Sequence, residues 1–169
     1  MKNLLTVTLF FYCLACPAID PLMNDVRVLY QQAATQENSC KELIALLEPF
    51  DENNNPLLLG YKGSATMMMG QHVLNPFSKL TYFKKGKDML HLAIESDKSN
   101  VELRYLRFTA QTNAPSFLRY GNKIEEDKTF LVESVSLLDD QYLKSMILGY
   151  LKTSAFLSDT EKKALEIRS

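Results

Sequence analysis

The chain has 169 residues, of which 46% are hydrophobic and 23% are charged, as in an ordinary globular protein. This length predicts one domain that can bury a substantial core. The formal net charge of −1 argues against a dedicated nucleic-acid-binding protein, which would carry a basic surplus on one face. The local run Lys84-Lys85-Gly86-Lys87 is interpreted as a solvated helix face, with a phosphate or membrane patch as the alternative.

Residues 1–18 have the pattern of an export signal. Lys2 supplies a short positive region, and residues 4–15 are apolar apart from two threonines. An apolar run of about a dozen residues is too short to span a membrane as a mature helix, but it suits the core of a signal peptide. We therefore expect export to the periplasm or cell envelope, with no transmembrane span in the mature chain.

Two processing routes fit this segment. Cleavage after Ala18 leaves residues 19–169 as a single domain, whereas lipoprotein processing leaves Cys16 as a lipidated first residue. Both routes remove Cys13, so the Cys13-x-x-Cys16 spacing is not expected to serve redox or metal chemistry. After cleavage at Ala18, Cys40 is the only remaining thiol and no internal disulfide can form.

Helix-start signals recur along the rest of the chain. An N-cap side chain precedes a proline at the first helical position in three places: Asp20-Pro21, Asn55-Pro56 and Asn75-Pro76. In a capping box, a Ser hydroxyl and a Glu carboxylate three residues later satisfy each other's backbone N–H groups. Three such boxes are predicted: Ser39–Glu42, Ser99–Glu102 and Ser158–Glu161. Asp139-Asp140 places negative charge at the start of a further helix, where the macrodipole favours it.

Residues 75–117 organise the predicted fold as two amphipathic helices joined by a short polar turn. In the first of them, apolar residues recur at helical spacing: Leu80, Phe83, Leu90 and Ile94. The buried stripe is wide, which indicates an interior helix with more than one neighbour. The second helix is predicted to end at Ala114, because Pro115 disfavours helical geometry in the residue before it.

No segment alternates cleanly enough to predict a strand, so the expected fold is all-α. About eight helices are predicted, arranged in antiparallel hairpins. The segment Phe83–Asn100, with Gly86 and Ala93 as small residues, resembles the second helix of a tetratricopeptide-type unit running into its turn. That family prefers Pro where this chain has Asn100. The resemblance implies a right-handed helical array, and an irregular bundle is the alternative.

A second resemblance covers residues 100–131 and concerns a family of small exported bacterial proteins. The residues that carry it are Arg104-Tyr105-Leu106-Arg107-Phe108, Pro115-Ser116-Phe117-Leu118, Glu126-Asp127-Lys128 and the closing Leu157-Ser158-x-x-Glu161-Lys162-x-x-Leu165. No activity is assigned to that family. The resemblance therefore implies a helical fold and export, and it leaves the function open.

Arginines and acids in the second half of the chain suggest an ionic cluster. Arg104 and Arg107 lie three residues apart on one side of their helix. Glu126 and Asp127 begin the next helix, which should pack antiparallel to it, and a bidentate pair with Arg107 would lock this hairpin. The functional alternative is a binding site for an anion or carboxylate formed by Arg104, Arg107 and Arg119.

The sequence contains no pattern that predicts catalysis or a metal site. Met67-Met68-Met69 lies near His72, and thioether and imidazole ligands suit Cu(I). Consecutive helical residues point about 100° apart, however, so three adjacent Met side chains cannot converge on one ion. His72 and His91 belong to different helices, and neither an HExxH motif nor a Gly-rich phosphate loop is present. We expect no metal, no cofactor and no enzymatic activity.

The main functional prediction is a non-enzymatic module of the cell envelope that presents a helical groove to a protein or peptide. Tyr61 and Tyr105, together with the three arginines, are its candidate contact residues, with a place in the hydrophobic core as the alternative for the tyrosines. The alternative is a carrier or sensor of a small anionic ligand held by Arg104, Arg107 and Arg119 inside the helical bundle.

Overall fold

The computed structural model describes residues 21–168, and the predicted export segment with Cys16 and Ala18 lies outside these residues. The described part of the chain is helical and contains no strand, which confirms the all-α prediction. Its eight α-helices are α1 (Pro21–Ala33), α2 (Glu37–Leu46), α3 (Pro56–His72), α4 (Pro76–Ser96), α5 (Val101–Asn113), α6 (Ile124–Ser134), α7 (Gln141–Thr153) and α8 (Asp159–Arg168). Two 3-10 segments, η1 (Ser116–Leu118) and η2 (Val135–Leu137), follow α5 and α6.

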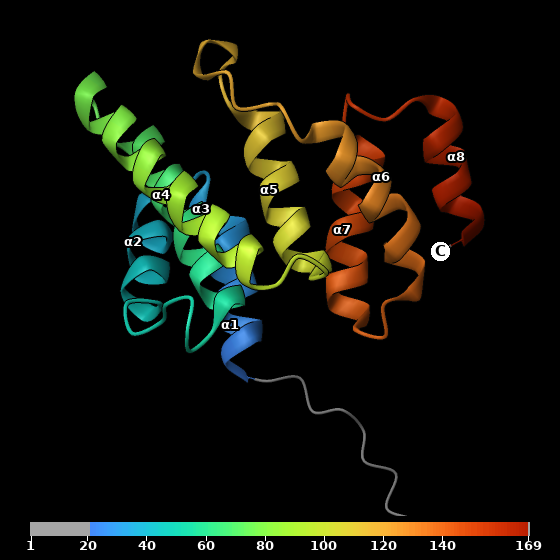
Figure 1. Cartoon of the computed structure of the whole chain (residues 1–169), viewed down its shortest axis with the longest axis horizontal. Helices are drawn as coiled ribbons and strands as arrows, with labels where there is room; N and C mark the ends of the chain where they lie inside the picture. Colours follow the sequence, from blue (N-terminus) through green and yellow to red (C-terminus); the bar gives the residue numbers. More distant parts are fainter. Residues whose placement is uncertain (1–20, 169) are drawn as a thin grey trace, which may run out of the picture.

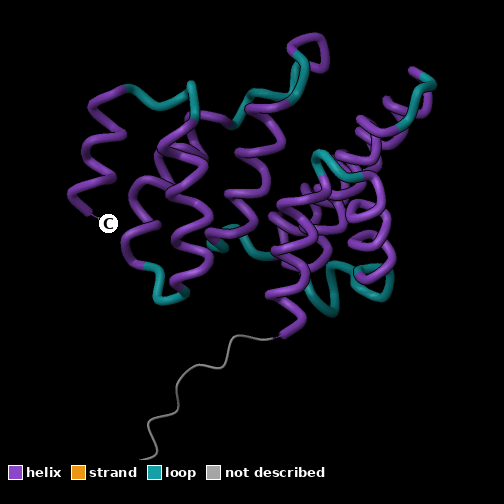
Figure 2. Tube along the Cα trace, turned by 180° about the vertical axis from the view of Figure 1, so that it is seen from behind, coloured by secondary structure: helices purple, strands orange, loops and turns teal. Residues whose placement is uncertain are grey.

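Helix α5 lies between two groups of helices. Figure 1 shows α1–α4 on one side of α5 and α6–α8 on the other, and the reverse view in Figure 2 shows the same division. Helix α5 contacts α3 and α4 in the first group and α6 in the second. Neighbouring helices therefore pack in pairs, while a tetratricopeptide-like superhelix remains a prediction from the sequence.

Helix α3 is buried around most of its circumference. Every residue from Leu58 to Met67 is buried except Lys62. It packs against α4 at a contact between two glycines. A Cβ atom added to Gly86 would lie 2.3 Å from the carbonyl oxygen of Gly63 and 2.7 Å from the backbone nitrogen of Met67. The two backbones can approach this closely only because neither glycine carries a side chain.

The predicted stripe of α4 is buried only in the second half of the helix. Leu90 and Ile94 belong to the core, and Phe83 is half-buried with its ring edge-on to Tyr120 at a centroid distance of 5.4 Å. Leu80 is exposed, contrary to the prediction. The reason is that the first turns of α4 extend beyond the neighbouring helices (Figure 1).

Most of the predicted helix starts are confirmed. Proline occupies the first helical position of three helices: α1, α3 and α4. N-cap side chains accept backbone hydrogen bonds at three starts: Asn55, Asn75 and Asp140. The capping box of α8 is also present. The Ser158 N–H donates to the Glu161 carboxylate over 2.7 Å, and the Glu161 N–H donates to the Ser158 hydroxyl over 3.3 Å.

Two predicted capping boxes are wrong. Helix α2 begins at Glu37 rather than after Ser39, whose buried hydroxyl instead donates to the side-chain oxygens of Gln32 and Gln36. A carboxylate in the first turn, here Glu37, interacts favourably with the positive end of the helix dipole.

At α5 the N-cap is Asn100 rather than Ser99. The Asn100 side-chain oxygen accepts from the backbone N–H groups of both Glu102 and Leu103, each over 3.1 Å. The Glu102 carboxylate is therefore not needed at the helix start, and it turns into the protein interior.

The α3–α4 contact predicts opposite outcomes for two glycine-to-alanine variants. Gly86→Ala forces a methyl group against backbone atoms and should lower the free energy of unfolding by about 3 kcal/mol. Gly149→Ala in α7 meets no atom within 4 Å and should raise it by about 1 kcal/mol, because alanine favours the helix. Urea unfolding of both variants measures this difference, and equal effects would contradict the packing described for α3 and α4.

Candidate functional site

Arg104 and Arg107 project from α5 toward the start of α6 and form an ionic cluster there. Arg107 binds Asp127 with both arms of its guanidinium, Nε to Oδ2 and Nη2 to Oδ1, each over 2.6 Å. Arg104 Nη1 contacts Glu126 Oε1 at 2.6 Å and Asp127 Oδ1 at 3.0 Å. Asp127 is 0% exposed, so its charge is fully covered by these two arginines. The arginines thus bind their own acidic partners and lock the α5–α6 hairpin.

The electrostatics of the cluster follow from these contacts. Hydrogen bonds from Lys123 and Arg104 lower the pKa of the Glu126 carboxyl to about 2. Burial alone would lower the pKa of Arg107, but hydrogen bonds and the charge of Asp127 outweigh it and raise that pKa above its usual value. The Glu126 carboxylate and the Arg107 guanidinium therefore remain charged over the physiological pH range.

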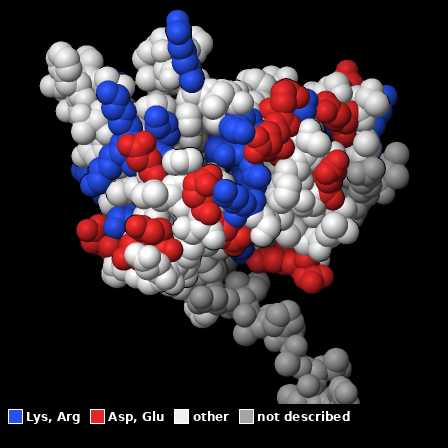
Figure 3. All heavy atoms as spheres, viewed as in Figure 1, with Lys and Arg blue, Asp and Glu red and all other residues white. Residues whose placement is uncertain are grey.

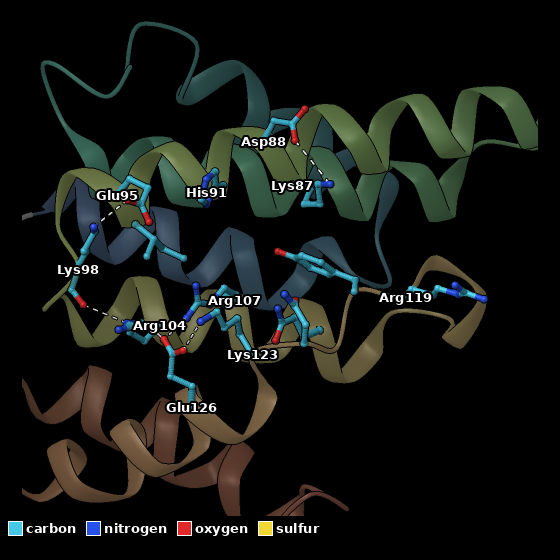
Figure 4. A pocket seen from close by; sticks show the side chains of 14 residues that line it. Lys87, Asp88, His91, Glu95, Lys98, Arg104, Arg107, Arg119, Lys123 and Glu126 are labelled. Atoms are coloured by element: carbon cyan, nitrogen blue, oxygen red, sulfur yellow. Dashed lines mark hydrogen bonds and ion pairs between the residues drawn. The ribbon is translucent and has the colours of Figure 1, made fainter.

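A groove of about 570 Å³ runs beside this cluster. Its walls come from the second half of α4, the outer face of α5, the loop after η1 and the start of α6 (Figure 4). Six basic residues line it: Lys87, Lys98, Arg104, Arg107, Arg119 and Lys123. Three acidic residues line it: Asp88, Glu95 and Glu126. The charged lining residues carry a surplus of three positive charges, or of two when the buried Asp127 that binds Arg104 and Arg107 is counted with them, whereas the whole chain has a net charge of −1.

Gln111 of α5 contributes an unused polar group to the groove. The residue is 4% exposed, and its side-chain oxygen is buried without a hydrogen-bond partner among the described residues. Most buried polar atoms in proteins are hydrogen-bonded, and leaving one unpaired costs about 1–3 kcal/mol. An unpaired amide at the lining of a cationic groove is therefore a candidate ligand contact.

Of the predicted binding residues, Arg104, Arg107 and Arg119 all line the groove, but they do not converge. Arg119 lies on the loop after η1, at the far end of the groove from Arg104 (Figure 4). It adopts a left-handed backbone conformation, with φ of 50°, and forms no salt bridge with the described residues. An anion held by all three arginines at once is therefore not supported.

Tyr61 and Tyr105 are not surface residues, contrary to the prediction. Tyr61 is completely buried in α3, where its ring packs edge-on against Tyr30 at 5.2 Å. Tyr105 is buried between α5 and α7, with its ring edge-on to Tyr150 at 5.9 Å. Both rings are part of the hydrophobic core, because neighbouring helices enclose the faces of α3 and α5 that carry them.

A buried ionic centre was not predicted from the sequence. Arg27 of α1 donates from Nε and Nη2 to the two carboxylate oxygens of Glu102, each over 2.7 Å. Its Nη1 donates over 2.7 Å to Asp140, the N-cap of α7. The Tyr61 hydroxyl also donates to Glu102. No groove residue takes part, so this centre has a structural role.

The surroundings shift the pKa values in this centre. Burial and the nearby charge of Glu102 raise the pKa of Tyr61 well above 10, so its hydroxyl stays protonated. Burial alone would lower the pKa of Arg27, but the hydrogen bonds and charges of Glu102 and Asp140 raise it overall.

The described residues offer no evident reactive thiol, metal site or membrane-spanning helix. Cys40 is buried, its thiol donates to the carbonyl oxygen of Ala65 over 3.2 Å, and burial raises its pKa to about 11. Such a thiol is unreactive. No group of three or more His, Cys, Asp or Glu side chains among the described residues is arranged to hold a metal ion. None of the described helices is both long and apolar enough to cross a membrane.

Comparison with protein-family models, curated proteins and solved structures found no significant match.

The buried ionic centre predicts a large loss of stability when one partner is removed. Arg27→Met leaves the Glu102 carboxylate in the core without a basic partner and should lower the free energy of unfolding by about 3–5 kcal/mol. Glu102→Gln should lower it less, because Arg27 keeps its salt bridge to Asp140. The double variant Arg27→Met/Glu102→Met should lose less than the sum of the single variants, because the two side chains interact directly. Glu95→Gln removes an exposed carboxylate paired with Lys98 and serves as the control, with little change expected. Additive effects in chemical denaturation would contradict the direct coupling.

Proposed function

We propose that this protein is a non-enzymatic module that binds an acidic peptide segment of a partner protein in the groove between α4 and the α5–α6 corner. The observation that carries the proposal is the surplus of positive charge among the residues that form that groove, which remains when the buried Asp127 is counted. Complementary charge steers association and fixes the register of a bound partner. In keeping with the export segment predicted from the sequence, the proposed place of action is the periplasm or cell envelope.

The unpaired amide of Gln111 supports a peptide rather than a simple anion. A side-chain amide offers a donor and an acceptor, which matches the acceptor and donor of a peptide bond. A fully deprotonated anion such as sulfate cannot donate a hydrogen bond to the buried Gln111 oxygen. A peptide backbone N–H can do so, and acidic side chains on the same peptide can reach the basic groove walls.

An exposed aromatic residue lies close in sequence to the groove residue Arg119. Phe117 is largely exposed in η1, two residues before Arg119. Aromatic side chains are enriched among the residues that dominate binding energy in protein interfaces. A peptide that binds Arg119 could therefore also contact the exposed Phe117 ring, which is two residues away in the sequence.

The carrier of a small anionic ligand has less support. That function needs arginine groups free to hold the ligand, but Arg107 is bound at both arms by Asp127, and Arg104 is bound by Glu126 and Asp127. A ligand would have to displace these ion pairs. An acidic peptide can instead bind Arg119, which forms no salt bridge with the described residues, and Lys87, whose Nζ lies 3.9 Å from Asp88 Oδ1. Lys98 is already paired with Glu95 at 2.9 Å.

The charge of the groove can be tested with a random peptide library displayed against the chain from Ile19. Enriched sequences should be rich in Asp and Glu. Binding of the best synthetic peptide, measured by fluorescence polarisation, should weaken about tenfold or more in Lys87→Glu/Arg119→Glu. Neither residue belongs to the α5–α6 ion cluster, so the fold should persist.

The matched control is Lys152→Glu/Lys163→Glu, which changes the net charge equally on α7 and α8, away from the groove (Figure 1). It should leave peptide binding nearly unchanged. Enrichment of neutral or basic peptides, or equal weakening by both double variants, would contradict the proposal.

Gln111→Met separates binding from stability. Methionine has a similar volume and removes the unpaired buried oxygen, so the free energy of unfolding should rise by about 1 kcal/mol or stay unchanged. Binding of the same acidic peptide should weaken, because the contact to the peptide backbone is lost. Isothermal titration and thermal unfolding measure the two effects. A variant that is both less stable and equally good at binding would show that Gln111 serves the fold alone.

A further inference from the structure

The end of the α3–α4 hairpin projects from the molecule and carries exposed apolar side chains. Leu74, in the connection between the helices, is 95% exposed, and Phe77 in the first turn of α4 is 82% exposed. Leu80, one turn further, is also exposed. Figures 1 and 2 both show this end reaching beyond the neighbouring helices. We call Leu74, Phe77 and Leu80 the hairpin tip.

The charge around the hairpin tip has one sign. Residues 53–87 include five lysines and no Asp or Glu. Lys79, Lys84 and Lys85 are exposed and form no salt bridge with the described residues. Glu37, at the start of α2, is already paired with Lys41 at 2.7 Å. Figure 3 shows the end of the hairpin as uncharged, with Lys and Arg atoms beside it.

We propose that the hairpin tip docks on the surface of an anionic lipid bilayer. Leu74 and Phe77 enter the interfacial region, and Lys79, Lys84 and Lys85 contact the lipid phosphates. Apolar side chains flanked by lysines bind such surfaces through buried area and attraction to anionic lipids. This inference concerns a different surface from the peptide groove and does not rest on the proposed function.

The spacing along α4 suits this arrangement. Lys79 lies two residues from Phe77, and Lys84 lies about 10 Å from Phe77 along the helix axis. Lysine stems can lie along apolar surface while their ammonium groups extend to the phosphates. The charges therefore stay close to the bilayer surface while the tip enters it. The basic run of α4, interpreted from the sequence as a solvated helix face, gains a role through its position beside this tip.

Charge argues against a second copy of the chain as the occupant. A symmetric contact between two tips would bring the unpaired lysines of both copies together without acids to balance them. Like charges at this distance repel, and little of the tip surface would be covered because it is narrow and convex. A lipid surface balances the charge and accepts a projecting apolar end without a shaped partner.

The absence of tryptophan in the chain allows a direct test. Phe77→Trp places the single tryptophan at the tip, and its emission can be excited selectively over that of the eight tyrosines. Leu137→Trp places the single tryptophan in η2 instead, where Leu137 is 81% exposed and is followed by Asp139 and Asp140. Both variants are made in the chain from Ile19, which retains every residue that the structure describes. With vesicles containing roughly a third phosphatidylglycerol, emission from the Phe77→Trp variant should shift to shorter wavelength, while emission from the Leu137→Trp variant should not. The protein should bind less tightly to vesicles of phosphatidylcholine alone.

Two further variants separate the apolar and charged contributions. Leu74→Ser/Phe77→Ser should reduce co-sedimentation with the anionic vesicles by about tenfold or more. Lys79→Gln/Lys84→Gln should weaken it by on the order of fivefold per lysine, and added salt should weaken it in the same direction. Leu137→Ser is the matched control for the apolar variant and should leave co-sedimentation with the anionic vesicles unchanged. All these side chains are exposed, so each variant should fold, and circular dichroism is the measurement that checks this.

The outcomes that would overturn the inference are distinct. Equal emission shifts in the Phe77→Trp and Leu137→Trp variants would mean general adsorption rather than docking by the tip. Binding that is unchanged in Leu74→Ser/Phe77→Ser would place the contact elsewhere. No binding to anionic vesicles, together with a tip-dependent contact to an envelope protein, would make the tip a protein-binding surface. None of these results depends on whether acidic peptides bind in the groove.

Discussion

The ion pair between Arg27 and Glu102 holds together helices that are far apart in the sequence. Arg27 is the only basic residue of α1, and Glu102 is the only acidic residue of α5. Because both charges are buried, each must be matched by a partner from another helix, and this requirement fixes how the helices meet. Tyr61 brings α3 to the same carboxylate, and Asp140 brings the start of α7 to the same guanidinium. Four helices from both sides of the molecule thus share one centre.

Burying charges costs free energy, so we infer that this centre specifies how α1 and α5 align as well as stabilising the fold. A hydrophobic contact between α1 and α5 would tolerate a shift along the helix axis. The bidentate geometry of Arg27 and Glu102 does not, because a shift of one turn would leave both charges unpaired in the core. The register set there also determines where the outer face of α5 stands relative to α4 and α6, and hence the shape of the groove.

Helix α5 directs its charges to opposite sides. Successive helical residues are rotated by about 100°, so Arg104 and Arg107 point well away from Glu102. Glu102 joins the buried centre, while the two arginines bind Glu126 and Asp127 at the groove wall. One helix of 13 residues therefore connects the core of the first helix group with the hairpin that leads into the second.

The sequence predicted those features that depend on local chemistry. Proline and N-cap side chains located the starts of α3 and α4, since both signals act within a few residues. The pairing of Arg107 with Asp127 could be anticipated because the two residues lie in consecutive helices joined by a turn. The pairs Arg27–Glu102 and Arg27–Asp140 bridge 75 and 113 positions, and no local pattern reveals them.

The same limit explains the misplaced residues. Glu102 fits a capping box as well as a buried ion pair, and only the capping of α5 by Asn100 decides between them. Tyrosine suits both interfaces and cores, so Tyr61 could not be placed without knowing that α3 is enclosed. Gln111 carries no signal at all in the sequence, because its importance comes from a buried oxygen that lacks a partner among the described residues.

Helix α4 provides both proposed binding surfaces, and its packing determines how they are related. Its first turns carry Phe77 and Leu80 of the hairpin tip, and residues from Lys87 onward line one wall of the groove. Between them, Gly86 presses against the backbone of α3 at Gly63, so the helix is held firmly where the two surfaces meet. Phe77 and His91 are 14 residues apart, which corresponds to about 21 Å along the helix. A peptide bound in the groove while the tip rests on a bilayer would therefore be held at a fixed distance from the lipid surface.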